Sequence, residues 1–207
     1  LLDGAIDDKK LSINFLQVVG SETERMARLV RDLLQLSDLD LRQSKWNKKA
    51  VDLKEIVEDT IQKLDVSIKN KEQKIYFGQE GSKENTAIIY ADKDRIGQVV
   101  LNLLSNSIKY TPKGGHININ IGIQGDTSVL EIEDNGIGIP KEDLARIFER
   151  FYRVDKARAR ELGGTGLGLS IAKEIIEAHE GTIEIFSEED KGTRTVIHLP
   201  IFIKNDV

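Results

Sequence analysis

Apolar residues recur at alternating four- and three-residue steps between residues 9 and 41, with Glu22 as the one polar interruption. This heptad pattern predicts one long helix with a narrow apolar seam. The seam consists of Phe15, Val19, Met26, Leu29, Leu33 and Leu36. A single helix cannot bury such a seam, so we expect it to pack in a helical bundle. The alternative is packing onto the domain that follows.

The charged residues of the same helix are expected on its outer face, away from the bundle. They are Glu24, Arg25, Arg28, Arg31 and Asp32. Residues 42–49 are polar and charged, which is typical of a linker. We therefore predict two units, residues 1–43 and residues 44–207.

The second unit mixes helical and strand patterns. Helices are predicted at 52–70, 92–110, 141–152 and 165–179, and strands at 86–90, 117–123, 129–133, 182–186 and 193–199, the last two joined as a hairpin around Asp190. The elements do not follow a strict βαβ alternation. This order predicts an α+β fold in which helices cover one face of a mixed sheet.

The amino-acid composition excludes several classes of function. The chain has 207 residues, 39% of them apolar, and a net charge of −5 without a basic field, so nucleic acid is not an expected partner. The absence of cysteine excludes disulfides and thiol chemistry. No apolar run approaches the roughly 20 residues of a membrane span. The chain starts at Leu1 without Met, so we expect a fragment whose membrane anchor, if present, lies outside it.

One face of the predicted 92–110 helix carries candidate metal chemistry. Gln98, Asn102, Asn106 and Lys109 follow four- and three-residue steps, with Tyr110 beside them. An Asn carbonyl is a hard, neutral oxygen that can hold Mg²⁺ beside phosphates. The alternative, an ordinary solvated face, stays equally open at this point.

Two glycine-containing segments follow. Asp134 ends a predicted strand, where a carboxylate can accept a hydrogen bond from an exocyclic amine, and Gly136 and Gly138 allow close approach to a flat ring. Taken alone, this segment more often forms a simple turn. Residues 163–169 (Gly-Gly-Thr-Gly-Leu-Gly-Leu) open a helix, whose free N–H groups and dipole favour phosphate over the alternative of a flexible linker. They form neither a Walker A motif nor a dinucleotide fingerprint.

Between these segments lie Phe148 and Phe151, whose spacing is typical of core packing. The basic stretch 153–162 is interpreted as a mobile loop. Within it, Arg158 and Arg160 are candidates for contact with a terminal phosphate.

Together the motifs resemble those of sensor histidine kinases. Residues 102–110 (Asn-Leu-Leu-Ser-Asn-Ser-Ile-Lys-Tyr) resemble the N box of that family, 134–138 the G1 box, 148–152 the F box and 164–168 the G2 box, in matching order and spacing. Residues 192–200 resemble the last strand, and 9–41 the second helix of the dimerisation and phosphotransfer hairpin. Residues 24–34 and 155–158 resemble the WalK branch of the family most closely.

The resemblance implies an ATP-binding α/β sandwich of the Bergerat type, with ATP or ADP and Mg²⁺ as cofactors. It implies Asp134 on the adenine amine, Asn102 and Asn106 as metal ligands, and a lid over residues 153–163. Catalytic roles are implied for Asn102, Lys109 and Arg158. The other implied nucleotide contacts are Tyr110, Gly136, Gly138, Ile139, Phe148, Gly164, Thr165, Gly166, Leu167, Gly168 and Thr195. Ser107 departs from the small apolar residue usual in the family.

The implied activity is that of a histidine protein kinase. Its γ-phosphate would pass to a histidine of the homodimeric bundle and then to the receiver domain of a response regulator. His116, His179 and His198 all lack the acceptor context of the family, so the acceptor is expected outside this chain. The chain is then the cytoplasmic portion of a membrane-anchored sensor kinase.

Two other classes of function remain. An ATP hydrolase of the same fold carries a Glu four residues before the metal-binding Asn, where this chain has Asn102, and an amide cannot act as a general base. A binding-only module is disfavoured because every pocket position is filled.

Overall fold

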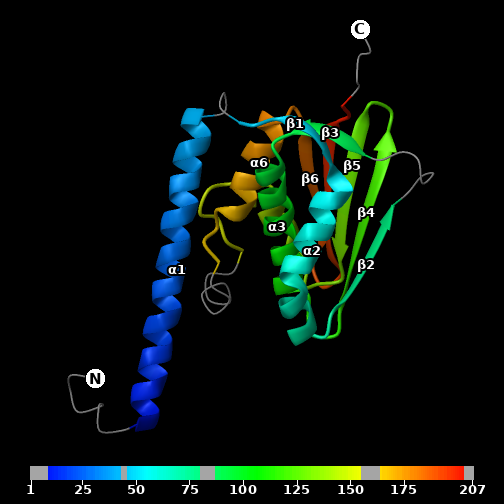
Figure 1. Cartoon of the computed structure of the whole chain (residues 1–207). Helices are drawn as coiled ribbons and strands as arrows, with labels where there is room; N and C mark the ends of the chain where they lie inside the picture. Colours follow the sequence, from blue (N-terminus) through cyan, green and yellow to red (C-terminus); the bar gives the residue numbers. More distant parts are fainter. Residues whose placement is uncertain (1–8, 43–45, 80–86, 155–163, 203–207) are drawn as a thin grey trace.

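The mixed sheet and its helical layer are the frame on which the candidate residues are arranged. In a computed structural model, residues 9–42, 46–79, 87–154 and 164–202 are described. Five strands form one sheet, and helices α2, α3 and α6 cover a single face of it (Figure 1). The helices are α1 (Lys9–Arg42), α2 (Leu53–Asn70), α3 (Lys93–Tyr110), α4 (Lys141–Leu144) and α6 (Gly168–Ala178). The strands are β1 (Lys49–Asp52), β2 (Lys74–Gln79), β3 (Ile88–Ala91), β4 (His116–Gln124), β5 (Thr127–Asp134), β6 (Thr182–Glu188) and β7 (Gly192–Pro200).

The strand order in the large sheet is β2-β4-β5-β7-β6. β2 pairs with β4 in parallel, whereas the β4–β5, β5–β7 and β7–β6 pairs are antiparallel. β1 and β3 form a separate antiparallel pair. The predicted fold class is confirmed, but the sequence pattern missed β1 and β2. β1 has one buried side chain, Val51, and β2 contains a glycine at position 78, so neither gives a strong strand signal.

The core lies between the sheet and the helices. Ile117, Ile119 and Ile121 alternate along β4 and are fully buried on the helix-covered face. Ile96, Val100 and Leu103 of α3 are buried in the same core cluster. Burying side chains of this size contributes about 1.5–3 kcal/mol each. The opposite face of α3 is therefore left for polar residues.

Lys71 and Gln73 hold the C-terminal end of α3. The Lys71 ammonium donates to the carbonyl oxygens of Ile108, Lys109 and Thr111 at 2.7–2.9 Å. The Gln73 amide donates to the carbonyls of Ile108 and Thr111 at 3.0 and 2.8 Å. These bonds satisfy carbonyl groups that a helix end leaves unpaired.

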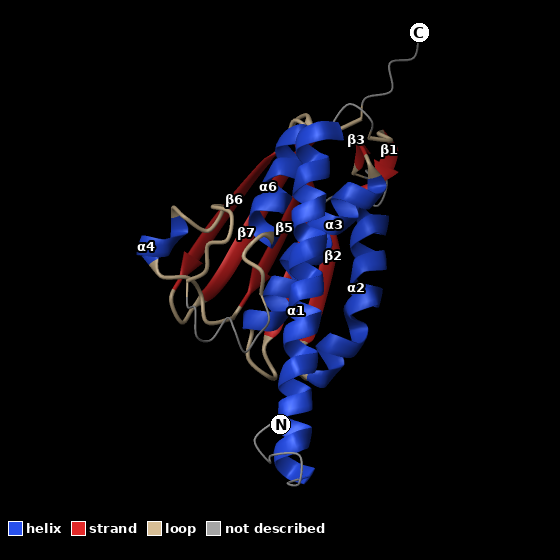
Figure 2. Cartoon of the chain, turned by 90° about the vertical axis from the view of Figure 1, so that its left-hand side faces the viewer, coloured by secondary structure: helices blue, strands red, loops and turns tan. Residues whose placement is uncertain are grey.

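Helix α1 runs alongside the helical layer and extends beyond it (Figure 2). Most of its apolar seam is exposed: Phe15 at 43% and Met26 at 59%. Leu36, at the other end of the seam, is 4% exposed and belongs to the core, and Leu29 packs against it. A straight helix rotates about 20° per heptad relative to a strict seven-residue repeat, so one seam cannot face the same surface along its whole length. The bundle stays a prediction for the exposed part of the seam.

The prediction that the charged residues of α1 all point outward is wrong for Asp32. Its carboxylate accepts a hydrogen bond from the Thr165 hydroxyl at 2.7 Å. Arg25 and Arg28 are also half-buried, whereas Glu24 and Arg31 are exposed. The reason is the rotation of the seam, which turns Arg28 and Asp32 toward the domain at this level of the helix.

Residues 46–48 are also more structured than the predicted linker. The Trp46 ring stacks on the His179 ring with centroids 5.0 Å apart, and the Lys48 ammonium donates to the Ala178 carbonyl at 2.7 Å. His179 is buried, and its two ring nitrogens bond backbone groups of Asp92 and Ile175. The chain entering the domain is thereby fixed to the end of α6.

Two predicted helices differ in extent. The helix predicted at 141–152 ends at Leu144 as α4. The chain continues in turns closed by hydrogen bonds between residues three apart, and Phe151 then adopts a left-handed φ of 67°. The Phe151 N–H donates to the Gly166 carbonyl at 2.9 Å, which holds this turn. The helix predicted from residue 165 begins at Gly168. The β6–β7 hairpin around Asp190 is confirmed. Among the described helices, none is both long and apolar enough to span a bilayer.

Candidate functional site

The predicted polar face of α3 meets the start of α6. The Asn102 amide nitrogen donates to the Gly168 carbonyl at 3.2 Å. The amide oxygen takes no part in this hydrogen bond. Asn106 lies one turn further along α3 and is half-buried. α3 therefore places two amide side chains beside the glycine turn at residues 164–168.

Lys109 lies at the inner edge of the same glycine turn. A Cβ atom at Gly164 would lie 2.9 Å from the Lys109 ammonium, and that ammonium is 5.0 Å from the centre of the Tyr110 ring. Burial lowers the pKa of Lys109 to about 8, and the positive charges of Arg153 and Arg28 add to this effect. An ammonium surrounded by cations is stabilised by an anion.

Asp134 lies at the end of β5 and is 7% exposed. Its carboxylate accepts the Gly136 N–H at 3.0 Å, a hydrogen bond from the Ser107 side chain and one from the Thr193 backbone. Burial raises the pKa of Asp134, and these three hydrogen bonds oppose the increase. The result is a buried carboxylate held in one orientation, as expected of a group that recognises a ligand.

The glycines near Asp134 serve close contacts within the protein. A Cβ atom at Gly136 would lie 2.7 Å from the Asp134 carboxylate and 2.9 Å from the Tyr110 carbonyl oxygen. Gly138 has a φ of +67°, and its Cβ would lie 2.0 Å from the Glu188 carbonyl oxygen. The Ile139 N–H donates to the Ser187 hydroxyl at 2.9 Å. This turn is therefore packed against the β6–β7 hairpin.

The glycine turn at residues 164–168 packs in the same way. Gly166 has a φ of +77°, and a Cβ there would lie 2.8 Å from the Phe151 backbone. The Thr165 hydroxyl is engaged by Asp32 of α1. The Leu167 side chain is fully buried in the core. The predicted contact between Leu167 and a nucleotide is therefore restricted to the backbone of Leu167.

The remaining predicted residues are more dispersed. Phe148 lies against α6, where the Lys173 ammonium is 5.4 Å from its ring centre. Thr195 is buried on β7, where it pairs with Ile132 of β5. Asp134 pairs with Thr193, two residues earlier on β7. Arg158 lies outside the described residues, as do residues 155–163 of the predicted lid.

Sequence reasoning missed three contributors. Ser107 was noted only as a departure from the family pattern, yet its side chain reaches Asp134. Thr193 depends on the register of β7 against β5, which sequence patterns do not fix. Arg153 lies close enough to depress the pKa of Lys109, although the two are 44 residues apart in the chain. Of the three, only Ser107 gave a signal in the sequence, because it places a hydroxyl on an otherwise apolar face of α3.

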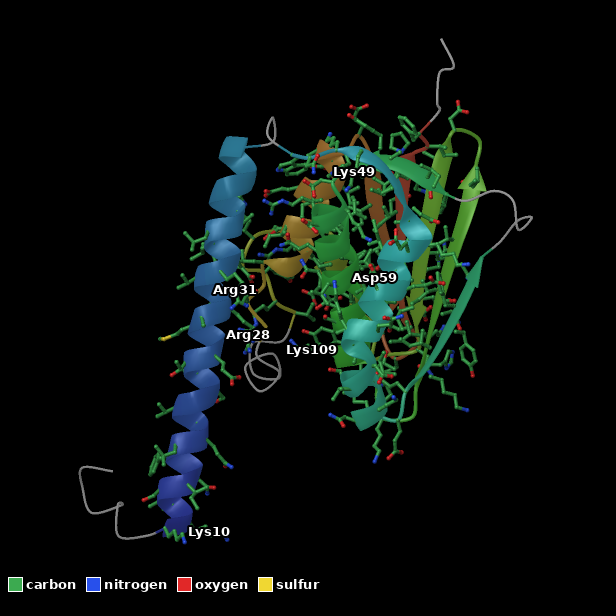
Figure 3. The ribbon with its side chains drawn as sticks, in the orientation of Figure 1. Lys10, Arg28, Arg31, Lys49, Asp59 and Lys109 are labelled. Carbon is green, nitrogen blue, oxygen red and sulfur yellow. The ribbon has the colours of Figure 1, made fainter. Side chains whose placement is uncertain are left out.

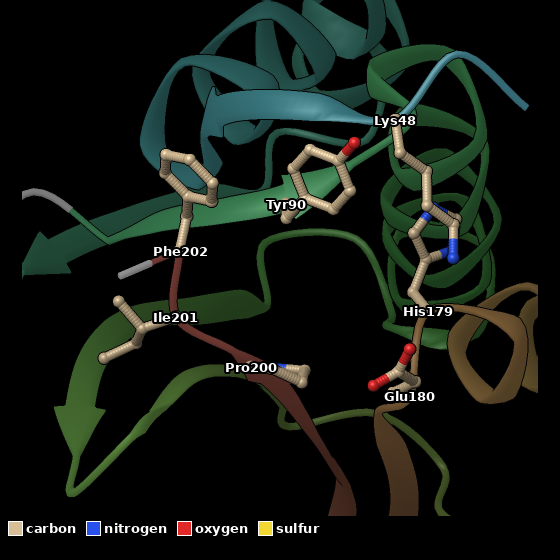
Figure 4. A pocket seen from close by; sticks show the side chains of 7 residues that line it. All are labelled: Lys48, Tyr90, His179, Glu180, Pro200, Ile201 and Phe202. Atoms are coloured by element: carbon tan, nitrogen blue, oxygen red, sulfur yellow. The ribbon is translucent and has the colours of Figure 1, made fainter. Parts of the chain in front are cut away.

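A separate pocket of about 280 Å³ lies where residues 46–48 enter the domain (Figure 4). It is lined by Lys48, Tyr90, His179, Glu180, Pro200, Ile201 and Phe202. Pro200 is paired with Thr127 at one end of the β5–β7 ladder, and Asp134 is at the other end. This pocket is thus remote from the candidate site and contains none of the predicted residues.

Known proteins share both the sequence and this arrangement. Residues 91–203 match the family described as "Histidine kinase-, DNA gyrase B-, and HSP90-like ATPase". The sensor histidine kinase WalK of Bacillus subtilis is 43% identical over 97% of this chain, and a sensor protein kinase WalK of Staphylococcus aureus is 40% identical over all of it. The chain spans 32% and 49% of these two relatives, respectively.

Solved structures agree with the sequence relatives. The Acinetobacter baumannii histidine kinase AdeS superposes with a TM-score of 0.72 and 27% identity, over 98% of this chain and 92% of its own. The catalytic domain of histidine kinase ThkA superposes with a TM-score of 0.65 and 26% identity, over 75% of this chain and 96% of its own. This chain belongs to the histidine kinase-, DNA gyrase B- and HSP90-like ATPases, and within them to the catalytic domains of sensor histidine kinases.

Proposed function

We propose that this chain binds Mg-ATP between α3 and the two glycine segments, and that its parent protein transfers the γ-phosphate to a histidine. The observation that carries the proposal is that α3 contacts both glycine turns. Its Asn102 and Lys109 side chains border the turn at residues 164–168. Its last residue, Tyr110, contacts the turn at Gly136, beside the buried and oriented Asp134 carboxylate. A carboxylate suits the amine of an adenine, and a cation with amides suits phosphates and a metal.

The residues present fit this ligand. Asp134 would accept from the adenine amine, with Ser107 and Gly136 fixing its orientation. The Asn102 amide is oriented by Gly168 so that its oxygen can face a cation, and Asn106 would supply a second oxygen. Bound Mg²⁺ would bridge phosphate oxygens and neutralise charge. Lys109 and Tyr110 would lie beside the phosphates of the bound nucleotide. The role of Arg158 is proposed from the sequence motif alone.

The other proposed nucleotide contacts surround this arrangement. They are Gly136, Gly138, Ile139, Phe148, Gly164, Thr165, Gly166, Leu167, Gly168 and Thr195. At Gly136 and Gly138 the close contacts seen are within the protein, so their proposed part is to shape the turn beside the base.

The wider pathway also belongs to this proposal. Residues 1–43 would be the remnant of a dimerisation and phosphotransfer hairpin, and residues 44–207 the catalytic domain. The exposed seam of α1 would pair within a homodimeric bundle in the parent protein. A response-regulator receiver domain would accept the phosphate from the histidine. Segments outside this chain would anchor the parent protein in a membrane.

Phosphotransfer is tested by supplying the acceptor in trans. With labelled ATP, the chain alone should gain no acid-labile phosphate, and a separate helical hairpin carrying the acceptor histidine should become labelled. Transfer should be slow and depend on concentration, because the acceptor is not tethered. Label on the chain alone would make one of its three histidines an acceptor. Binding of ATP without transfer would support a binding-only module, and rapid phosphate release would support a hydrolase.

A pH dependence of phosphate binding follows from Lys109. With its pKa lowered to about 8, the ammonium is charged below that pH and loses its proton as the pH rises through it. Mg-ATP affinity should therefore fall about three- to tenfold between about pH 7 and about pH 9. Calorimetric titration at several pH values measures this. Adenosine binding should stay constant, and Lys109→Met should remove the high-pH decrease. A decrease that persists in Lys109→Met would assign it to another group.

A further inference from the structure

Helix α1 brings a positive charge to the edge of the candidate site. The hydrogen bond between Asp32 and Thr165 fixes α1 beside the glycine turn. Arg28 lies one helical turn before Asp32, on the same face of α1. Figure 3 shows Arg28 on the side of α1 that faces Lys109. A residue far from the nucleotide motifs in the sequence thus lies beside them in the fold.

Arg28 joins two other cations there. The charges of Arg28 and Arg153 both act on Lys109, which places the three groups within electrostatic reach of one another. In Arg153, Nε and one terminal nitrogen are buried without a hydrogen-bond partner in the described part of the chain. Buried donors left unpaired cost free energy, and so does repulsion among like charges.

Among the residues that the structure describes, the acidic groups near this cluster compensate its positive charge poorly. Arg28 forms a long ion pair of 3.9 Å with Glu24, whose side chain is 77% exposed, so this pair is weak. The Asp32 carboxylate already accepts from Thr165. An anion with several oxygens would satisfy the unpaired donors and remove the repulsion. The cluster borders the Lys109 end of the site, opposite the adenine-binding carboxylate in the proposed arrangement.

We propose that Arg28 of helix α1 is a phosphate-binding residue, which contacts the polyphosphate of a nucleotide together with Lys109 and Arg153. This inference rests on the proposed binding of ATP. It makes α1 part of the nucleotide site rather than a bundle element alone. Because coupling between sites is reciprocal, the polyphosphate in turn strengthens the docking of α1 on the domain.

The test compares two charge removals on the same helix. Arg28→Gln and Arg31→Gln remove the same charge, but Arg31 is exposed and does not act on Lys109. Affinities for Mg-ATP and for adenosine are measured by calorimetry. Arg28→Gln should weaken Mg-ATP binding about 5-fold, as expected for a partly exposed charge pair, and leave adenosine unchanged. Arg31→Gln should change Mg-ATP binding less than about twofold. Arg28→Lys should recover most of the lost affinity.

Three results would overturn the inference. Equal ATP affinities in Arg28→Gln and Arg31→Gln would show that Arg28 does not contact phosphate. An equal loss for ATP and adenosine would show a structural effect on the whole site. Absence of ATP binding by the unmodified chain would refute the proposed function itself and this inference with it, a result distinct from the first two.

Discussion

Asp134→Asn is expected to weaken adenosine binding by about 10- to 150-fold, the largest effect on ligand binding in this chain. Asn keeps the size of the side chain and one carbonyl oxygen but loses the charge. A hydrogen bond to a charged group contributes about 1.5–3 kcal/mol, which corresponds to that range of affinity. Calorimetry with adenosine measures it, and inorganic triphosphate should bind almost as before.

The matched control is Glu133→Gln, which removes a carboxylate from the neighbouring exposed position. It should leave adenosine affinity unchanged. The pH dependence gives a second criterion, because burial raises the pKa of Asp134 above its usual range. Adenosine affinity should fall as the pH decreases through that raised pKa, and Asp134→Asn should lack this decrease.

The same raised pKa separates recognition from a structural role. A carboxylate whose pKa is raised by folding costs folding free energy once it is ionised, above that pKa. Asp134→Asn should therefore leave the free energy of unfolding at neutral pH unchanged or increased. A large loss of stability, with equal loss of adenosine and triphosphate binding, would make Asp134 a structural residue.

Gly138→Ala is expected to cost about 2–5 kcal/mol of the free energy of unfolding, the largest effect on stability considered. Its φ of +67° disfavours any residue with a Cβ, at about 1–2 kcal/mol. The added Cβ would also lie 2.0 Å from the Glu188 carbonyl oxygen, so the β6–β7 hairpin must shift. Urea denaturation measures the loss, which is large against a typical total of about 5–15 kcal/mol.

Gly125→Ala is the control for backbone conformation. Gly125 has a φ of +60°, and nothing lies within 4 Å of the position of an added Cβ. It should show the conformational cost alone, about 1–2 kcal/mol. Equal losses in the two variants would show that the contact between residue 138 and the hairpin does not restrain the turn.

The sequence predicted most of the helical layer and the antiparallel strands because their patterns depend on local burial. The alternation along β4 and β5 and the two faces of α3 are examples. Predictions were weaker where contacts between distant residues determine the conformation. The 141–152 segment has helical periodicity, yet after Leu144 it forms successive turns, and its end is tied to Gly166 by a hydrogen bond from Phe151. Residues 46–48 are polar in pattern but are fixed by His179 and Ala178.

The candidate site shows the same division. Asn102, Lys109 and Asp134 were predicted from motif and spacing. The structure places Asn102 and Lys109 beside the turn at residues 164–168 and Asp134 beside Gly136. The supporting contacts of Ser107, Thr193 and Arg153 arise from register and from three-dimensional proximity. The orientation of α1 could not be predicted either, because a heptad seam does not reveal which surface it meets at each level.

The bonds from Lys71 and Gln73 to the end of α3 have a consequence for local unfolding. Gln73 immediately precedes β2 and Lys71 lies three residues before it. β2 is an edge strand that pairs with β4 across an interval of 42 residues. Opening of this edge would withdraw both side chains, and the last turn of α3, which carries Lys109 and Tyr110, would fray. Ligands that bind the closed form slow such opening. Amide hydrogens of Ile75 and Phe77 should therefore exchange more slowly when nucleotide is bound, although β2 itself lies outside the candidate site.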